Sequence, residues 1–336
     1  MSAWIKTTRQ KIAGLVLGGA LVILFACCSV VYGYTEVGWK TALQSLTDFN
    51  GSKEHIIVLE NRIPRALIGA AVGVSLAVAG ALLQGLTRNP LASPDIFGIN
   101  AGAGFFIVLS ATFFSVSSIH QFAWLAFFGA ILSTLIVYLL GAAGQGGLTP
   151  VKLTLAGASL WLLFASLTQG MLALNEKALE EVLFWLAGSV EGRKLEVLLA
   201  VLPYLAAGWL GALLLAGQMN VLLMGEDVAV SLGQRTVIVK ILAGVVIALL
   251  AGGSVAVAGP VGFIGVVIPH IARGLVGMDQ RWVIPYSALL GAILLLLADI
   301  GARYVIMPNE VPVGVMTALI GTPFFVYIAR RGLSRL

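Results

Sequence analysis

The chain has 336 residues, of which 59% are hydrophobic and only 10% are charged, and its formal net charge is +5. An average soluble domain is roughly one quarter charged, so this composition excludes a water-soluble globular protein. It indicates an all-α polytopic membrane protein, with residues 1–336 forming a single transmembrane domain. The cations do not cluster with aromatic residues, so we expect no nucleic-acid partner.

Ten apolar segments predict about ten membrane spans of roughly 20 residues each. They are residues 12–32, 64–86, 94–114, 122–140, 153–174, 197–216, 237–258, 259–273 (a turn and a short eighth span), 283–300 and 313–328. Glycine and proline predict a break in the tenth span near residues 321–323. Residues 33–61 are polar and of mixed charge, which indicates a loop outside the membrane.

The second span carries small residues at a spacing of four: Gly69, Gly73, Ala77 and Ala81. Such a bare helix face lets another helix approach closely, because packing contacts drive helix association in a bilayer. The connection that follows, residues 88–95, is polar and contains two prolines. It predicts a tight turn that leads directly into the third span, with Ser93 as the N-cap and Asp95 at the positive end of the helix.

Two polar segments carry short helices in this prediction. Residues 175–196 are rich in acids around an apolar patch, and we expect a short helix over about 178–190 at the outer face. The longest internal loop is residues 218–235. Within it, residues 225–233 predict a short helix with Glu226 and Asp227 at its start and Gly233 at its end.

The orientation follows from the excess of lysine and arginine in cytoplasmic loops of membrane proteins. With the N-terminus inside, most basic residues fall in internal loops and most glutamates fall outside. We therefore expect a multi-pass membrane protein with both termini in the cytoplasm.

The chemistry that the sequence lacks is also informative. No ionisable residue falls at mid-depth in the predicted spans, whereas proton-coupled transporters usually need a buried ionisable relay. There is no Walker A motif, and the adjacent Cys27 and Cys28 offer no metal-ligand spacing. We expect no catalytic residue, no metal and no cofactor on this chain, and an energy source in another subunit.

Six motifs together resemble one family, the FecCD-type permeases of importers for ferric siderophores, haem and cobalamin. They are RIPR at residues 62–65, QGLTRNPLA at 84–92, SPDIFGI at 93–99, FWLAGS at 184–189, GPVGFIGVVIPH at 259–270 and ADIGAR at 298–303. The resemblance covers nearly the whole chain in order. It implies the type II fold of ATP-binding-cassette (ABC) importer permeases.

The resemblance also implies the partners. A second permease subunit, identical or paralogous, completes the pore in a dimer. Two cytoplasmic ATPases use ATP and Mg²⁺, and an external solute-binding protein delivers a ferric siderophore. Membrane lipid surrounds the assembly.

By the same resemblance, Arg62, Arg65 and Arg303 receive acidic residues of the binding protein, and the charge pattern places all three outside. The alternative is that these arginines only anchor helix ends at the lipid headgroups. Residues 218–235 resemble the element that seats in the ATPase, with Gly225, Glu226, Asp227 and Gly233 in the short helix. For the two acids the alternative is simple helix capping.

The family narrows its cytoplasmic exit at two loops, and the matching gate candidates are Asn89 and Leu91 on one and Thr149 and Pro150 on the other. Pro150 departs from the hydroxyl residues common there, and Asn89 is equally suited to capping the turn before Pro90. We thus expect a non-enzymatic permease that imports a ferric siderophore by alternating access. Import of haem or cobalamin is the nearest alternative, and proton-coupled transport is a remote one.

Overall fold

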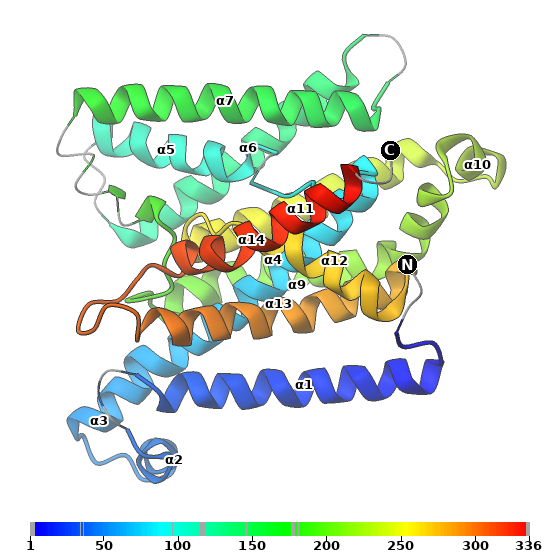
Figure 1. Ribbon diagram of the computed structural model, residues 1–336. Coiled ribbons are helices and arrows are strands. Elements are labelled where there is room, and N and C mark those ends of the chain that lie inside the picture. The colour runs from blue at the N-terminus through cyan, green and yellow to red at the C-terminus, as the bar shows by residue number, and fades with distance from the viewer. Residues whose placement is uncertain are drawn as a thin grey trace.

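The computed structural model describes residues 4–333 apart from residues 34, 36, 96, 115–117, 145–146, 176–178, 180–181 and 184 (Figure 1). Its named elements are helices. They are α1 (Thr8–Val31), α2 (Trp39–Thr47), α3 (Lys53–Ile56), η1 (Ile57–Arg62), α4 (Ile63–Thr87), α5 (Ile99–Phe114), α6 (Ile119–Ala142), α7 (Pro150–Leu174), α9 (Leu195–Leu223), α10 (Glu226–Ser231), α11 (Thr236–Ala258), α12 (Ile264–Val276), α13 (Gln280–Ala302) and α14 (Val313–Leu333).

Among the described residues, seven helices are long and apolar enough to cross a membrane, and three apolar helices are shorter. Together they match the ten predicted segments and confirm the all-α membrane fold. The helices α2 and α3 lie at one end of the bundle, here called the outer end. The helix α10 and both chain ends lie at the opposite end, here called the inner end (Figure 1).

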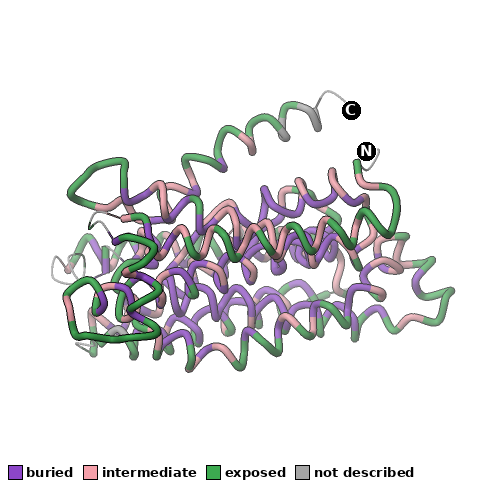
Figure 2. Tube along the Cα trace, turned by 90° about the horizontal axis from the view of Figure 1, so that it is seen from below, coloured by how far each residue is buried: buried purple, intermediate pink, exposed green. Residues whose placement is uncertain are grey.

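The helix α4 runs through the centre of the bundle. In the most apolar stretch of residues 53–87, which include α4, 78% of residues are buried, against 11% in α1, which lies at the edge of the bundle (Figure 1). Figure 2 shows the buried residues gathered in the interior of the bundle. A Cβ atom added at Gly73 would lie 2.3 Å from the Gly291 carbonyl oxygen of α13, and one at Gly80 would lie 2.2 Å from the Gly265 oxygen of α12. The predicted small-residue face is therefore confirmed at Gly73, because only a residue without bulk allows these backbones to touch, and Gly80 adds a close contact that was not predicted.

At the outer end, α4 continues without interruption from α3 and η1, so that residues 53–87 form one helix. The η1 segment is π-helical, and the Ile63 N–H donates to the carbonyl of Val58, five residues back. Pro64 follows at once and has no N–H of its own to donate, which is consistent with the local change of hydrogen-bond pattern. The π-helical turn ends at Arg62, so Arg62 lies immediately before the first residue of α4.

Two of the ten apolar segments are half-helices, that is, helices that reach only part of the way across a membrane. The helix α5 has 16 residues and α12 has 13, which at 1.5 Å per residue makes them about 24 Å and about 20 Å long. The hydrocarbon core of a bilayer is about 30 Å thick, so neither crosses it alone.

The predicted helix start at Ser93 and Pro94 is wrong, because α5 begins only at Ile99 and the described residues before it form turns. The Gly98 carbonyl accepts a hydrogen bond from Ser133 at the middle of α6, and Gly98 also lies against Trp161 at the middle of α7. The chain thus re-enters the bundle after α4 and starts α5 at mid-depth. Gly98 has a φ of +76°, which a residue with a side chain adopts with strain.

Two further expectations are corrected. The helix α14 is continuous from Val313 to Leu333 with Pro323 inside it, so the break at 321–323 is absent. The helix α9 extends to Leu223, which shortens the inner loop predicted over 218–235. The predicted outer helix at 178–190 lies partly outside the described residues (178, 180, 181 and 184). The described residues 179, 182–183 and 185–186 are helical, and Val182, Trp185 and Val190 are buried within the protein.

Candidate functional site

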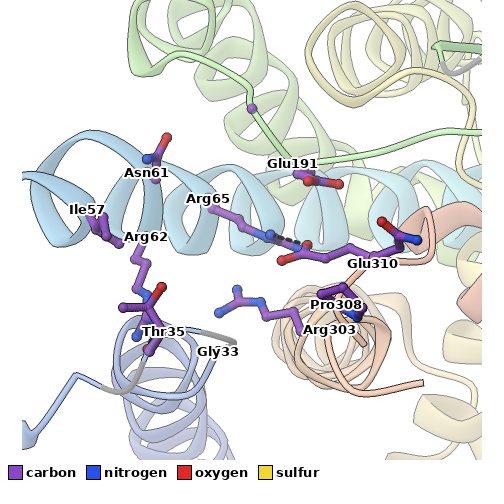
Figure 3. Close-up of a pocket in the computed structure, with 12 residues that line it drawn as sticks. Gly33, Thr35, Ile57, Asn61, Arg62, Arg65, Glu191, Arg303, Pro308 and Glu310 are labelled. Carbon is purple, nitrogen blue, oxygen red and sulfur yellow. Dashed lines mark hydrogen bonds and ion pairs between the residues drawn. The ribbon is translucent and has the colours of Figure 1, made fainter. Parts of the chain in front are cut away.

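The three arginines that the sequence singles out converge on one pocket at the outer end (Figure 3). The pocket has a volume of about 450 Å³. Its lining comes from the loop after α1, the π-helical turn, α4, the loop before α9 and the loop between α13 and α14. Charged side chains dominate this lining: Arg62, Arg65, Arg303, Glu191 and Glu310.

Arg62 fastens the end of α1. Its guanidinium donates to the carbonyl oxygens of Val30 at 2.9 Å and Val31 at 2.5 Å, and also to that of Thr35. The last carbonyls of a helix have no partner within the helix and carry partial negative charge, so a cation stabilises them. Only 6% of Arg62 is exposed. Its position at the end of the π-helical turn aims the side chain at α1 (Figure 3).

Arg65 bridges two carboxylates from the opposite wall. Its Nε lies 2.9 Å and its Nη2 lies 2.7 Å from Oδ1 of Asp299, and its Nη1 lies 2.6 Å from Oε2 of Glu310. A guanidinium presents its donors as a planar fork, which matches this two-sided arrangement. Asp299 is 1% exposed, whereas Glu310 reaches the pocket surface.

Arg303 completes the cluster. It lies one helical turn after Asp299 and donates to Oδ2 of that residue at 2.5 Å. The same guanidinium donates to the carbonyls of Ser29 and Tyr32, each at 2.6 Å. Asp299 therefore receives two arginines at once, and two of the three arginines hold the end of α1.

The charges of the pocket are nearly balanced. Three arginines line it against two glutamates, and Asp299 beneath is already committed to its two arginines. Burial and the neighbouring charge of Glu310 raise the pKa of Glu191 above its usual range. Arg62 and Arg303 hold protein carbonyls and Arg65 holds carboxylates, and both predicted roles of these arginines stay predictions.

At the inner end, the predicted short helix is present as α10, Glu226–Ser231, between Gly225 and Gly233. Gly225 and Gly233 both have positive φ, and the Gln234 N–H donates to the carbonyl of Ala229, which closes the helix end. Ala229 is buried. Apolar side chains in and next to α10 are exposed at the tip of the molecule: Met224, Val228, Val230 and Leu232.

The two acids of α10 differ. Asp227 is exposed, whereas Glu226 forms an ion pair with Lys240 of α11 at 2.5 Å. Simple capping does not account for Glu226, since its carboxylate is bonded to another helix.

The gate candidates lie on two separate connections. The Asn89 side chain accepts a hydrogen bond from the Leu91 N–H at 3.0 Å, which is the turn-capping role that the sequence left open. Thr149 caps α7 by accepting from the Lys152 N–H, and Pro150 is the first residue of that helix. In the described part of the chain, no hydrogen bond joins one pair to the other.

A carboxylate does lie at mid-depth, contrary to the expectation from the sequence. Asp95 sits in the re-entrant segment, where its Oδ2 accepts from the Phe263 N–H at 3.3 Å and its Oδ1 accepts from Asn100. Phe263 precedes the first residue of α12, so Asp95 stabilises the start of a half-helix inside the bundle. The sequence placed Asp95 at a helix start near the membrane surface because the turn pattern is the same in both settings.

Sequence reasoning also missed Asp299, Glu310 and Lys240 as partners of the charged residues. The spacing of Asp299 and Arg303, four residues apart in a helix, could have indicated one pair. The pairing of Arg65 with Asp299 joins residues 234 positions apart and left no local signal. Within the described residues, no three His, Cys, Asp or Glu side chains gather as metal ligands do.

These features define a multi-pass membrane protein with a charged pocket at one end and an exposed, partly apolar helix at the other. The chain belongs to the FecCD transport family, whose family model matches residues 21–331.

Relatives of known name extend over nearly the whole chain. It is 56% identical over 312 residues to the "Probable siderophore transport system permease protein YfiZ" of Bacillus subtilis, covering 93% of this chain and 94% of that protein. It is 42% identical over 333 residues to the "Ferric enterobactin transport system permease protein FepD" of Escherichia coli, covering 98% of each. A solved structure described as an inward-facing conformation of a metal-chelate type ABC transporter superposes with a TM-score of 0.82 at 28% identity, over 94% of this chain and 98% of that one.

Proposed function

We propose that this chain is a permease subunit of an ABC importer that carries a ferric siderophore across the cytoplasmic membrane. The observation that carries the proposal is the family match over residues 21–331, with relatives named for siderophore and ferric enterobactin transport that align over most of their length. The role is not enzymatic. ATP is hydrolysed, with Mg²⁺, in partner subunits.

The outer pocket is the proposed docking site for an external solute-binding protein. A carboxylate on that protein would meet Arg65 by displacing Glu310, which is the more exposed of its two acidic partners. Arg62 and Arg303 keep their carbonyl partners on α1 and hold the pocket in shape.

The helix α10 is the proposed contact with a cytoplasmic ATPase. Val228, Val230 and the following Leu232 expose apolar side chains on a segment outside the spans, and exposed apolar side chains of this kind mark a contact with a partner. This assignment places both termini in the cytoplasm, because they lie at the same end of the bundle as α10 (Figure 1).

The full transporter then contains two permease subunits, identical or paralogous, two ATPases and one binding protein. In the proposed cycle, closure of the ATPases moves α10, and the outer and inner constrictions open in turn. Asn89, Leu91, Thr149 and Pro150 lie on the two turns that would form the inner constriction. Asp95 is bonded to the start of α12 and to Asn100, which favours a structural role over a proton relay.

Uptake of iron-55 tests the proposal. An iron-starved strain lacking this chain is complemented with it and offered a panel of hydroxamate, catecholate and citrate chelates together with haem. We expect rescue by one ferric siderophore class, which is lost when the partner ATPase is inactivated. Rescue by haem alone, or by cobalamin alone in a parallel growth assay, would contradict the siderophore assignment. Uptake that survives loss of the ATPase would contradict ATP-driven transport.

A further inference from the structure

A buried lysine at the inner end joins three parts of the chain. Lys240 is 3% exposed and lies in the second turn of α11. Its ammonium group donates to Oε1 of Glu226 in α10 at 2.5 Å and to the carbonyl of Leu148, just before α7, at 2.6 Å. One cation thus connects the short helix at the tip of the molecule to the loop that begins α7.

Carbonyl groups of the loop before α7 accept hydrogen bonds from lysine side chains. Two of its glycines, Gly144 and Gly147, have positive φ. The Lys152 ammonium donates to the carbonyls of Ala143 and Gly147 at 3.1 and 3.3 Å, but Lys152 belongs to α7 itself. Lys240 ties the described part of this loop to α11.

Stability alone does not account for this arrangement. Taking a lysine out of water is costly, and an apolar residue at the same place would pack without that cost. Its partner Glu226 is 41% exposed, and ion pairs with an exposed member contribute little net stability. Lys240 is held by two segments that both lie outside the core of the bundle.

The position of Lys240 within α11 is itself fixed. Its backbone carbonyl accepts a hydrogen bond from Tyr138 of α6 at 3.0 Å, and Tyr138 also packs against Gly244 one turn further along α11. The backbone of Lys240 is therefore held in place. A displacement of Glu226 must either move the Lys240 side chain with it or break the ion pair.

We propose that Lys240 is a positioning residue that transmits displacement of α10 to the loop before α7, so that movement at the ATPase contact opens or closes the inner constriction at Thr149 and Pro150. The inference rests on the proposed function, since it assigns α10 to the ATPase and this loop to the gate. It adds the physical connection between them.

The test measures the gate directly and needs no transported substrate. In the complete transporter in lipid nanodiscs, Cys27 and Cys28 are replaced by alanine and Thr149→Cys is labelled with a membrane-impermeant maleimide. Labelling rates are compared without nucleotide and with ATP trapped by vanadate. Lys240→Met removes both hydrogen bonds, Lys240→Arg keeps a donor for each, and Glu226→Gln weakens only the bond to α10.

A matched control is Lys11→Met. Lys11 lies in α1, where its ammonium sits 5.5 Å from the Trp282 ring, away from the link. ATP hydrolysis and the amount of assembled transporter are measured for every variant, so that a variant that fails to fold is recognised by its loss of assembly.

We expect Lys240→Met to reduce the nucleotide-dependent change in labelling rate about fivefold or more while ATP hydrolysis continues, which is the size of a typical coupling between sites. Glu226→Gln should give a smaller reduction, and Lys240→Arg and Lys11→Met should behave as the wild type does.

An unchanged nucleotide response in assembled Lys240→Met would overturn the inference. If Lys240→Met does not assemble, the nucleotide-dependent change in labelling of Glu226→Gln is compared with that of Lys240→Arg. Equal changes in these two variants would then overturn the inference. No nucleotide response in the wild-type chain would instead count against the proposed function, and the inference would fall with it.

Discussion

At the outer end, Asp299 is 1% exposed and receives hydrogen bonds from two arginines, whereas at the inner end Glu226 is 41% exposed and is paired with the single cation Lys240. The outer cluster is redundant, since Arg62 and Arg303 both hold carbonyls at the end of α1 and Arg65 holds two carboxylates. The inner link has one donor group for two segments.

The difference indicates what each end is built to do. A cluster whose arginines and buried aspartate each have several partners keeps one shape, because losing any single contact leaves the others in place. A link through one ion pair with an exposed member can break and re-form at small cost in free energy. We therefore interpret the outer end as a fixed platform and the inner end as the moving part.

We expect the largest loss of stability from a substitution in α4, the helix that runs from one end of the bundle to the other. Gly80→Val would place a Cβ atom 2.2 Å from the Gly265 oxygen and force α4 away from α12. Overpacking against backbone costs about 3 kcal/mol or more, so we expect most of the folded protein and both charge clusters to be lost. Gly19→Val is the control, because a Cβ at Gly19 meets no other atom within 4 Å. Thermal unfolding in detergent measures both, and equal stability of the two variants would contradict the packing argument.

We expect a smaller loss of stability when a carboxylate of the outer cluster is neutralised, and the loss should be larger for a buried carboxylate than for an exposed one. Asp299→Asn leaves Arg65 and Arg303 without a buried counter-charge, and removal of one member of a buried pair costs about 3 kcal/mol. Glu310→Gln removes only the pocket-facing partner of Arg65 and should cost about 1 kcal/mol or less. The measurement is again thermal unfolding of the purified protein. The idea of a buried, redundant platform would fail if Glu310→Gln were the more damaging change.

The sequence is sufficient to predict much of this comparison. Hydropathy places the long spans, and the excess of cations in internal loops puts Arg62, Arg65 and Arg303 at one end together. The glycines around 226–231 predict α10, because a helix end with positive φ needs residues without side chains.

What the sequence does not give is contact between distant segments. Asp299 meets Arg65 across 234 positions, and Glu226 meets Lys240 through a turn that hydropathy does not resolve. The depth of residues 93–98 also escapes prediction, because a proline turn before an apolar helix has the same pattern at the membrane surface and inside the bundle. The contact that fixes this depth, the hydrogen bond from Ser133 of α6 to the carbonyl of Gly98, joins residues 35 positions apart.

The smallest effect concerns the charge of the pocket. Glu191→Gln removes one negative charge from the lining, so we expect affinity for the acidic binding protein to rise about two- to fivefold at neutral pH. The raised pKa of Glu191 means that acidification protonates it earlier than an ordinary glutamate, and its charge is then lost in the wild type as well. The difference between wild type and variant should therefore shrink as the pH falls.

Binding of the binding protein to the permease in nanodiscs, measured by biolayer interferometry at neutral pH and at about pH 5, checks this prediction. Glu60→Gln is the control, because Glu60 is exposed at the same end but does not line the pocket. A difference that widens on acidification would show that the effect does not come from the charge of Glu191.

Hydrogen–deuterium exchange of the complete transporter in nanodiscs, with and without trapped ATP, tests the contrast between the two ends most directly. We predict that nucleotide changes amide exchange in described residues of 143–149 and in 224–235, and leaves peptides around Arg62 and residues 299–304 unchanged. Equal changes at both ends, or changes confined to the outer peptides, would contradict a fixed outer platform joined to a moving inner link.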